Sequence, residues 1–303
     1  MSEKIITTPT VEQFKKILPL ICNWETSADP KEWTSKNPLW GHCAVVSLIA
    51  QNLFGGELVR ASLRGTPFEE SGSHYWNKLL DGEESDFTEE QFGGKLGIEL
   101  VGEPRTREYV LYDPKTHEPR EIMQRYKTLA YRLVGKLYSH QNGGVTSSPI
   151  YRECFMAAIE SPCQKMKMGC LVIHKTRFVY SCYNKTLEPL ARLCDPTCIR
   201  LQIQSRTDPM IGACGHAEEL ALWPVNRMGT PINECDLYII GLYPTGLPWF
   251  RKEPEFTCLR CAVQMYNAGV RSVSFPYKSS WMTVSAKEAL ETALKYAVGE
   301  RWV

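Results

Sequence analysis

Apolar residues recur at helical spacing in the middle of the chain. Between residues 121 and 138 they follow one another at steps of three and four positions: Ile122, Tyr126, Leu129, Leu133 and Leu137. Because one helical turn takes about 3.6 residues, this spacing gathers the apolar side chains on one face. The pattern predicts an amphipathic helix that packs on the preceding segment and closes a first domain.

The second half of the chain alternates between helical and β-rich runs. Helices are predicted at 151–159, 216–222 and 259–267, and strands at 169–173, 177–182, 237–242 and 270–275. The first two strands are close enough in sequence to form a hairpin, and Gly269 marks the end of the last helix. Alternating helices and strands indicate an α/β layered domain with some parallel strand pairing.

A segment typical of a linker separates the two halves. Residues 141–149 combine two adjacent glycines, small polar residues and a closing proline, and this composition favours flexible backbone. A chain of 303 residues is long enough for two domains of ordinary size. We therefore expect a first domain at 1–140, a linker at 141–149 and a second domain at 150–303.

Composition and charge narrow the class of protein and its partners. With 43% hydrophobic and 23% charged residues, the chain has the composition of a globular protein. A net charge of +1 provides no basic field for constitutive nucleic-acid binding, which favours a small-molecule ligand. The chain has no apolar run of the roughly 20 residues that a membrane span needs, and its first residues lack the apolar core of a signal peptide. We expect a cytoplasmic protein that does not enter membranes.

Twelve cysteines, ten of them in the second half, indicate metal ligands or nucleophiles, because we expect a reducing compartment. His216 precedes the pair Cys258 and Cys261, so one imidazole and two thiolates can hold a zinc ion. Three protein ligands leave a tetrahedral corner open to water, as in catalytic zinc sites. The two cysteines lie one helical turn apart, and a helix that begins at Cys258 would stabilise both thiolates.

Glu218 lies two residues after His216. We expect its carboxylate to carry protons to and from the zinc-bound water instead of binding the metal, since zinc lowers the pKa of that water to about 7. Two other interpretations are a purely structural zinc site and a redox pair at Cys258 and Cys261. A structural site more often has a fourth cysteine or histidine where Glu218 stands, and no thioredoxin-like pattern adjoins the cysteines.

The pattern His-x-Glu followed by Cys-x-x-Cys resembles the signature of the zinc-dependent cytidine deaminase superfamily. Further segments resemble its deoxycytidylate deaminase branch: 161–163, 168–169, 182–184, 194–200 and 212–218. The resemblance spans residues 150 to 280 and implies a three-layer α/β/α fold with a mixed sheet, a zinc cofactor and a homo-oligomer. It also implies that Asn184 contacts the sugar of the substrate. Thr257 and Leu220 depart from the family pattern, which has Pro and Asn at these places.

A second zinc site is implied by the same resemblance. Four cysteines match the non-catalytic zinc site of some deoxycytidylate deaminases: Cys163, Cys194, Cys198 and Cys214. Four sulfurs would complete a tetrahedral shell and leave no corner for water. The alternative is that Cys163 is a small buried residue and the other three are loop thiols.

The first domain contains a cysteine, a histidine and an aspartate in an order that suits thiol catalysis. An apolar helical run at 45–53 places Cys43 at the N-terminus of an expected helix, His74 lies in an expected strand, and Asp86 follows a turn. A cysteine activated by a histidine that a carboxylate orients is the general arrangement of thiol hydrolases and transferases. A buried cysteine, a core histidine and a turn aspartate would give the same sequence.

The segment 41–92 around these residues resembles the YunG-like proteins. That resemblance implies an α+β first domain with a papain-like layout, and it implies no particular reaction.

The second domain is thus predicted to be a hydrolytic deaminase of a cytosine-type nucleotide or nucleoside, similar to deoxycytidylate deaminase. Zinc hydroxide would attack C4 of the base, and Glu218 would pass a proton to N3 and then to the departing amine. The products would be the uracil compound and ammonia.

Three other functions fit parts of the sequence. The enzyme could act on a base in single-stranded DNA or RNA, for which a loop offers stacking and charge through Tyr243, Trp249, Phe250 and Arg251. That loop could equally cover a small substrate or pack on another subunit. The deaminase could also be an effector governed by a sensing or protein-binding first domain. A zinc-binding scaffold without activity leaves the acidic Glu218 unexplained.

Overall fold

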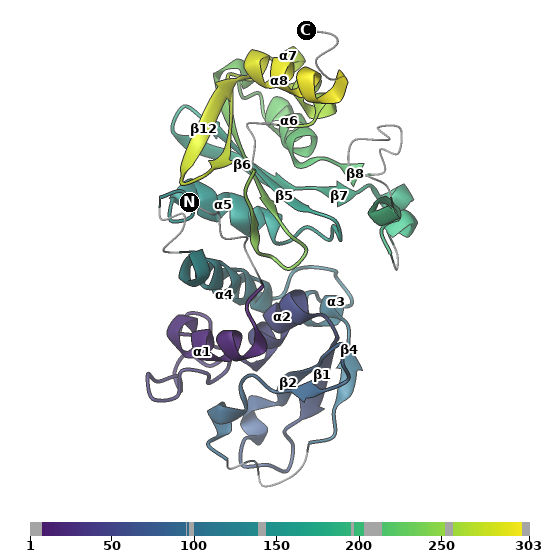
Figure 1. Ribbon diagram of the computed structural model, residues 1–303. Helices are drawn as coiled ribbons and strands as arrows, with labels where there is room; N and C mark the ends of the chain where they lie inside the picture. The colour runs from purple at the N-terminus through teal and green to yellow at the C-terminus, as the bar shows by residue number, and fades with distance from the viewer. Residues whose placement is uncertain are drawn as a thin grey trace. The chain divides into compact units, whose positions relative to one another are not determined.

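The helix predicted at 121–138 is present as α4, Glu121–Tyr138, in the computed structural model of the chain. The structure describes residues 8–94, 96, 100–138, 144–194, 197–202, 214–251 and 257–298. The chain divides into two units, Met1–Lys136 and Leu137–Val303, and the division falls in the last turn of α4 (Figure 1). Of the expected linker, residues 141–143 lie outside the described residues, and Pro149 is already the first residue of the next helix.

The first unit combines helices with a small antiparallel sheet. Its elements are α1 (Val11–Ile21), α2 (Cys43–Phe54), β1 (Glu57–Ser62), β2 (Ser73–Lys78), β3 (Glu84–Ser85), β4 (Glu103–Arg105), α3 (Arg107–Leu111) and α4, with 3-10 turns at Glu69–Ser71 and Glu89–Phe92. The strand order is β3-β2-β1-β4, and every pairing is antiparallel. These elements make an α+β unit, as predicted, while the papain-like layout stays a prediction.

Helix α2 is the central element of the first unit. Its residues Val45, Val46, Leu48 and Ile49 are buried, because apolar side chains follow one another around the whole helix and every face is covered. The helix packs on β2, and Asn52 near its end donates a hydrogen bond to the Tyr126 hydroxyl of α4 at 2.7 Å. Cys43 is the first residue of this buried helix.

The second unit contains one large sheet and four helices in its described residues. Its elements are α5 (Pro149–Ala158), β5 (Lys167–His174), β6 (Arg177–Tyr183), β7 (Lys185–Thr186), β8 (Cys214–Gly215), α6 (Ala217–Arg227), β9 (Cys235–Leu242), β10 (Pro248–Trp249), α7 (Leu259–Ala268), β11 (Ser272–Tyr277), β12 (Ser280–Ser285) and α8 (Ala286–Val298). Three 3-10 helices lie at Glu188–Cys194, Ile199–Gln202 and Ile232–Glu234. The predicted hairpin is present as β5 and β6, and Gly269 ends α7 with a φ of 78°.

The sheet of the second unit is mixed, as predicted. Its order is β12-β11-β9-β5-β6, in which β9 and β11 are parallel and the other neighbours are antiparallel. Successive residues of a strand point to opposite faces. Gly169 of β5 faces α5, where a Cβ would lie 2.4 Å from the Cys154 carbonyl oxygen, whereas Cys170 packs with α6 residues in the core. Helix α5 therefore covers one face of the sheet and α6 the other (Figure 1).

Helices α7 and α8 lie on the α6 side, since Met265 and Ala289 belong to the same core cluster as Ala221 of α6. The second unit thus has the three layers expected from its resemblance. Among the described residues, the helices are all too short or too polar to cross a membrane.

Candidate zinc centre

Three side chains at the ends of two helices come together in the second unit. His216 is the N-cap of α6, Cys258 is the N-cap of α7, and Cys261 lies in the first turn of α7. His216 Nδ1 lies 3.3 Å from Cys258 Sγ and 3.2 Å from Cys261 Sγ, and all three ligand atoms lie within 4.8 Å of one another. A tetrahedral zinc site would place nitrogen and sulfur about 3.6 Å apart. The three residues therefore fit a zinc ion after a shift of a few tenths of an ångström.

Hydrogen bonds among these side chains already favour one thiolate. The Cys261 thiol is the main cause that lowers the pKa of Cys258 to about 4, and His216 adds to the effect while burial opposes it. The same Cys258 contact, together with burial, raises the pKa of Cys261 well above its usual value. The two sulfurs thus share one proton, which a divalent cation would displace because metal ligands bind as thiolates.

Glu218 is buried beside these ligands and is not one of the three that converge. Its Oε1 accepts a hydrogen bond from Thr257 Oγ1 at 2.7 Å. The pKa of His216 is raised mainly by its hydrogen bond to Cys258, while burial opposes the increase. The charge of Glu218 is a smaller cause that also raises it. Thr257, which departs from the family pattern, therefore has a defined contact here, and it holds the predicted proton carrier.

A neighbouring acid, Glu219, ties the two helices of the site together, and the sequence analysis missed it. Its carboxylate accepts hydrogen bonds from Arg260 Nε at 2.5 Å, from Arg260 Nη2 at 2.7 Å and from Gln264 Nε2 at 2.5 Å. It also accepts one from the His216 backbone N–H at 3.1 Å. Because Arg260 lies between the two cysteines, this bidentate pair sets the distance between His216 and the thiols. The arginine inside Cys-x-x-Cys was the available sequence signal.

Asn184, predicted to contact the substrate, is buried and hydrogen-bonded to the start of β5. Its Oδ1 accepts from Met168 N at 2.7 Å and from Ser161 Oγ at 2.8 Å, and its Nδ2 donates to Met166 O at 2.9 Å. An amide has two hydrogens on its nitrogen. Among the described residues one of them is unused, so the substrate role stays a prediction beside this structural one.

Replacing Asn184 by Ala is expected to destabilise the second unit by about 1–3 kcal/mol, because partners that are buried with it lose their hydrogen bonds. Urea unfolding of the full chain, followed by a probe in the second unit, measures this. Asn184→Asp should be destabilised as well, because its carboxylate still accepts from Met168 and Ser161 but no longer donates to the Met166 carbonyl. An Ala variant as stable as the unchanged chain would show that these bonds contribute nothing to stability.

The four cysteines of the predicted second zinc site are neighbours. Cys194 and Cys198 have sulfurs 3.7 Å apart, and the Thr186 hydroxyl lies 3.2 Å from Cys194 Sγ and 3.8 Å from Cys214 Sγ. Burial is the main cause that raises the pKa of Cys198. The charge of Cys163 is a smaller cause in the same direction, so Cys163 lies near Cys198. Unlike the His216 group, these described sulfurs include no three that all lie within 4.8 Å of one another.

The aromatic loop after β9 packs largely on its own unit. Trp249 belongs to β10 and pairs with Gly241 of β9. The Arg251 guanidinium lies 5.2 Å from the centre of the Trp249 ring and 4.7 Å from that of Phe275. Tyr243 is 40% exposed and remains a surface on which a base can stack.

In the first unit, the structure brings together the three residues that suit thiol catalysis. His74 Nε2 lies 2.5 Å from Asp86 Oδ2. Burial lowers the pKa of His74, but the neighbouring Asp86 and Cys43 raise it to about 9.

Comparison with known proteins assigns each unit. Residues 10–138 match the family model YunG protein, and residues 146–276 match the model Cytidine and deoxycytidylate deaminase zinc-binding region. The uncharacterized protein YunG of Bacillus subtilis (strain 168) is 30% identical over 104 residues, which are 34% of this chain and 82% of that protein. The chain belongs to the YunG family. We call Met1–Lys136 the YunG unit and Leu137–Val303 the deaminase unit.

Both resemblances read from the sequence are confirmed. The zinc-binding region in the deaminase unit supports a zinc-dependent hydrolytic deaminase in general. A crystal structure of cytidine deaminase from Burkholderia pseudomallei matches 46% of this chain and 92% of its own, with 14% sequence identity and a TM-score of 0.31.

Proposed function

We propose that the deaminase unit hydrolyses the exocyclic amine of a cytosine-type nucleotide or nucleoside, such as deoxycytidylate or a close analogue. The observation that carries the proposal is the buried carboxylate of Glu218 beside the converging His216, Cys258 and Cys261. In a structural zinc site a buried acid that is not a ligand usually orients a metal ligand, whereas Glu218 accepts a hydrogen bond from Thr257. A deamination reaction needs such an acid, because a proton must reach the ring and then the leaving amine.

His216, Cys258 and Cys261 would hold the metal. Zinc, when bound, supplies an activated water molecule for attack on C4 of the base. Glu218 takes one proton from the attacking water and delivers it to N3. It then takes the second proton from the new hydroxyl on C4 and delivers it to the departing amine, so that cytosine and water give uracil and ammonia. The Thr257 hydroxyl orients the carboxylate for these transfers through its 2.7 Å hydrogen bond. The unused amide hydrogen of Asn184 is suited to bind a substrate oxygen.

The geometry favours a small molecule over a polynucleotide. The net charge of +1 gives little attraction for a phosphate backbone. Arg251 and Trp249, which would serve a single strand, stack on each other within the unit. A homo-oligomer and control of the deaminase by the YunG unit remain hypotheses.

A panel of amines tests the proposal. Ammonia release is measured with the zinc-loaded full chain on cytosine, adenine and guanine nucleosides, on their nucleotides and on short oligonucleotides. We expect release from cytosine nucleosides or nucleotides, with a mass gain of one unit when amine becomes carbonyl. Release confined to oligonucleotides would replace the small-molecule proposal with the nucleic-acid alternative, and release from adenine or guanine compounds alone would refute the cytosine assignment.

We also propose that Cys163, Cys194, Cys198 and Cys214 hold a second, structural zinc. The support is that four thiols from three separate segments lie together, with Cys194 and Cys198 at 3.7 Å, close to the sulfur spacing of a tetrahedral site, about 3.8 Å. Metal analysis of the purified chain decides this, because one zinc per chain contradicts the second site.

A further inference from the structure

The YunG unit holds a cluster of reactive side chains that deamination does not use. His74 of β2 is 1% exposed, and its Nε2 lies 2.5 Å from Asp86 Oδ2. The other carboxylate oxygen of Asp86 accepts two hydrogen bonds from Thr88, one from the backbone N–H at 2.9 Å and one from the hydroxyl at 3.2 Å. Asp86 is therefore held in one orientation against the imidazole.

These contacts decide which nitrogen of His74 is basic. An ionised carboxylate only accepts hydrogen bonds, so the hydrogen of the neutral ring is on Nε2 and the lone pair is on Nδ1. Nδ1 lies 3.4 Å from Gln91 Nε2, and the amide of Gln91 is oriented because its Oε1 accepts from the Gly41 N–H at 3.2 Å. Cys43 lies near enough to the ring to raise its pKa. Since Asp86 occupies Nε2, Nδ1 is the nitrogen available to the thiol, in exchange for the Gln91 contact.

Cys43 lies among groups of positive charge or partial charge. Cys43 is the first residue of the twelve-residue helix α2, at the positive end of the helix dipole. The guanidinium of Arg125 lies near enough to Cys43 for an electrostatic interaction between them. The buried Nε of Arg125 has no hydrogen-bond partner among the described residues. Burial lowers the pKa of His74, but Asp86 and Cys43 outweigh it and raise the pKa to about 9. The contacts of His74 therefore stabilise its imidazolium form once the ring has taken up a proton.

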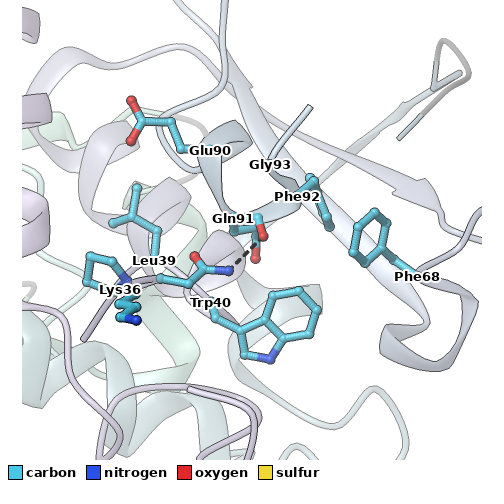
Figure 2. A pocket seen from close by; sticks show the side chains of 10 residues that line it. Lys36, Leu39, Trp40, Phe68, Glu90, Gln91, Phe92 and Gly93 are labelled. Carbon is cyan, nitrogen blue, oxygen red and sulfur yellow. Dashed lines mark hydrogen bonds between the residues drawn. The ribbon is translucent and has the colours of Figure 1, made fainter. Parts of the chain in front are cut away.

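Figure 2 shows a cavity of the YunG unit, with a volume of about 370 Å³. Its wall combines the aromatic rings of Trp40, Phe68 and Phe92 with polar or charged side chains of Lys36, Asn37, Glu90 and Gln91. The cluster lies behind this wall: the Phe92 ring is 4.9 Å from the His74 ring, and Gln91 Nε2 is 3.4 Å from His74 Nδ1. A cavity of this size with an aromatic wall suits an apolar group of a small ligand.

We propose that the YunG unit is a second active centre, in which Cys43 attacks the carbonyl carbon of an amide, ester or thioester whose apolar acyl group occupies this cavity. Cys43 is the nucleophile and His74 is the base. Asp86 is a positioning residue that acts through His74. Two reactive centres on one chain would then be chemically independent, one for an amine on a ring and one for a carbonyl.

Each step uses groups present in the cluster and water. The Cys43 proton moves to His74 Nδ1, a carbon–sulfur bond forms, and the bond from the carbonyl to the leaving amine, alcohol or thiol breaks. The leaving group takes the proton from His74. Water, deprotonated by the same nitrogen, then attacks the thioester, so the carbon–sulfur bond breaks, a carboxylic acid leaves and the thiol is restored.

The test uses the full chain and two probes of defined structure. Iodoacetamide at neutral pH should alkylate Cys43 about ten or more times faster than Cys22, the other cysteine of the YunG unit, whose buried thiol has a raised pKa. With p-nitrophenyl phenylacetate, mass spectrometry should find one phenylacetyl group on Cys43 and a burst of nitrophenol. The p-nitrophenyl acetate analogue, which lacks the aromatic group, should react more slowly. Peptide mapping assigns each adduct to its cysteine.

Variants separate catalysis from packing. His74→Gln should slow alkylation and acylation of Cys43 by about 10² to 10⁴, and Asp86→Asn should move the pH midpoint of alkylation upward, because the imidazolium loses its counter-charge. Cys43→Ala should remove the acyl adduct, whereas Cys22→Ala should keep it. Thermal unfolding identifies any variant that fails to fold, and Asp86→Asn, which retains the shape of the side chain, then decides. Equal Cys43 rates in the unchanged chain and in a folded Asp86→Asn or His74→Gln chain would refute the proposal, as would an acyl group found only on other residues.

Discussion

The variant Glu218→Gln is expected to keep its zinc and to release ammonia about 10² to 10⁴ times more slowly than the unchanged chain, the usual contribution of a general acid and base. Gln has nearly the shape of Glu, and its amide oxygen can still accept the Thr257 hydrogen bond, which is 2.7 Å long for Glu218. It cannot take up and return a proton. Ammonia release and zinc content, measured on the same preparation, check both parts of this expectation.

Thr257 provides a graded control for that result. Thr257→Val removes the hydroxyl and keeps the volume, so the Glu218 carboxylate loses an oriented donor. Turnover should fall by about ten- to a hundredfold, the contribution of one hydrogen bond to a charged group. Thr257→Ser retains the donor and should stay near the unchanged rate. If Glu218→Gln retained more activity than Thr257→Val, the carboxylate would not be the proton carrier.

The sequence predicted those features that depend on local spacing. Helix α4 spans the predicted residues, because the three- and four-residue spacing of its apolar positions continues along the whole segment. The hairpin of β5 and β6 followed from two β-rich runs separated by a short turn. The ligand group His216, Cys258 and Cys261 could be predicted although its members are far apart in sequence, since each lies at a helix start and metal chemistry restricts the residue types.

Contacts between distant charged or polar groups could not be predicted from the same patterns. Glu219 next to Glu218 is indistinguishable in sequence from a solvent-exposed acid of a first helical turn, yet it binds Arg260 across the helix pair. The role of Thr257 depends on the position of a carboxylate on another helix. The sequence pattern placed Asn184 at the end of a strand. Only the fold shows that its side-chain amide is hydrogen-bonded to the backbone of Met166 and Met168 at the start of β5.

The YunG unit illustrates the same division. The order of Cys43, His74 and Asp86 raised thiol catalysis as one of two interpretations. The tautomer of His74 follows only from the 2.5 Å contact with Asp86, and the cavity beside it only from the packing of three aromatic residues distant in sequence. The residue types thus suggested thiol catalysis, and the contact between His74 and Asp86 indicates which ring nitrogen would act as the base.

Removal of zinc should be as damaging as loss of Glu218, and it should also weaken the fold of the deaminase unit. His216 and Cys258 cap two different helices, and Cys261 lies in the first turn of one of them, so a bound ion joins α6 to α7. A ligand present at a hundred times its Kd stabilises the folded state by about 2.7 kcal/mol. A chelator should therefore lower the unfolding midpoint of the deaminase unit and abolish ammonia release, and added zinc should restore both.

Cys261→Ser isolates this site from any second zinc. Serine oxygen is a poor substitute for a thiolate toward zinc, so the variant should lose one zinc per chain, all measurable ammonia release and the stabilisation by added metal. Cys235→Ala is the matched control, because Cys235 is also buried and free in the same unit, and its thiol donates to the Pro231 carbonyl instead of facing the ligand group. A Cys261→Ser chain with unchanged zinc content would show that the ion is held elsewhere. Since Glu218 lies beside this ligand group, the deamination chemistry would then lose its structural basis.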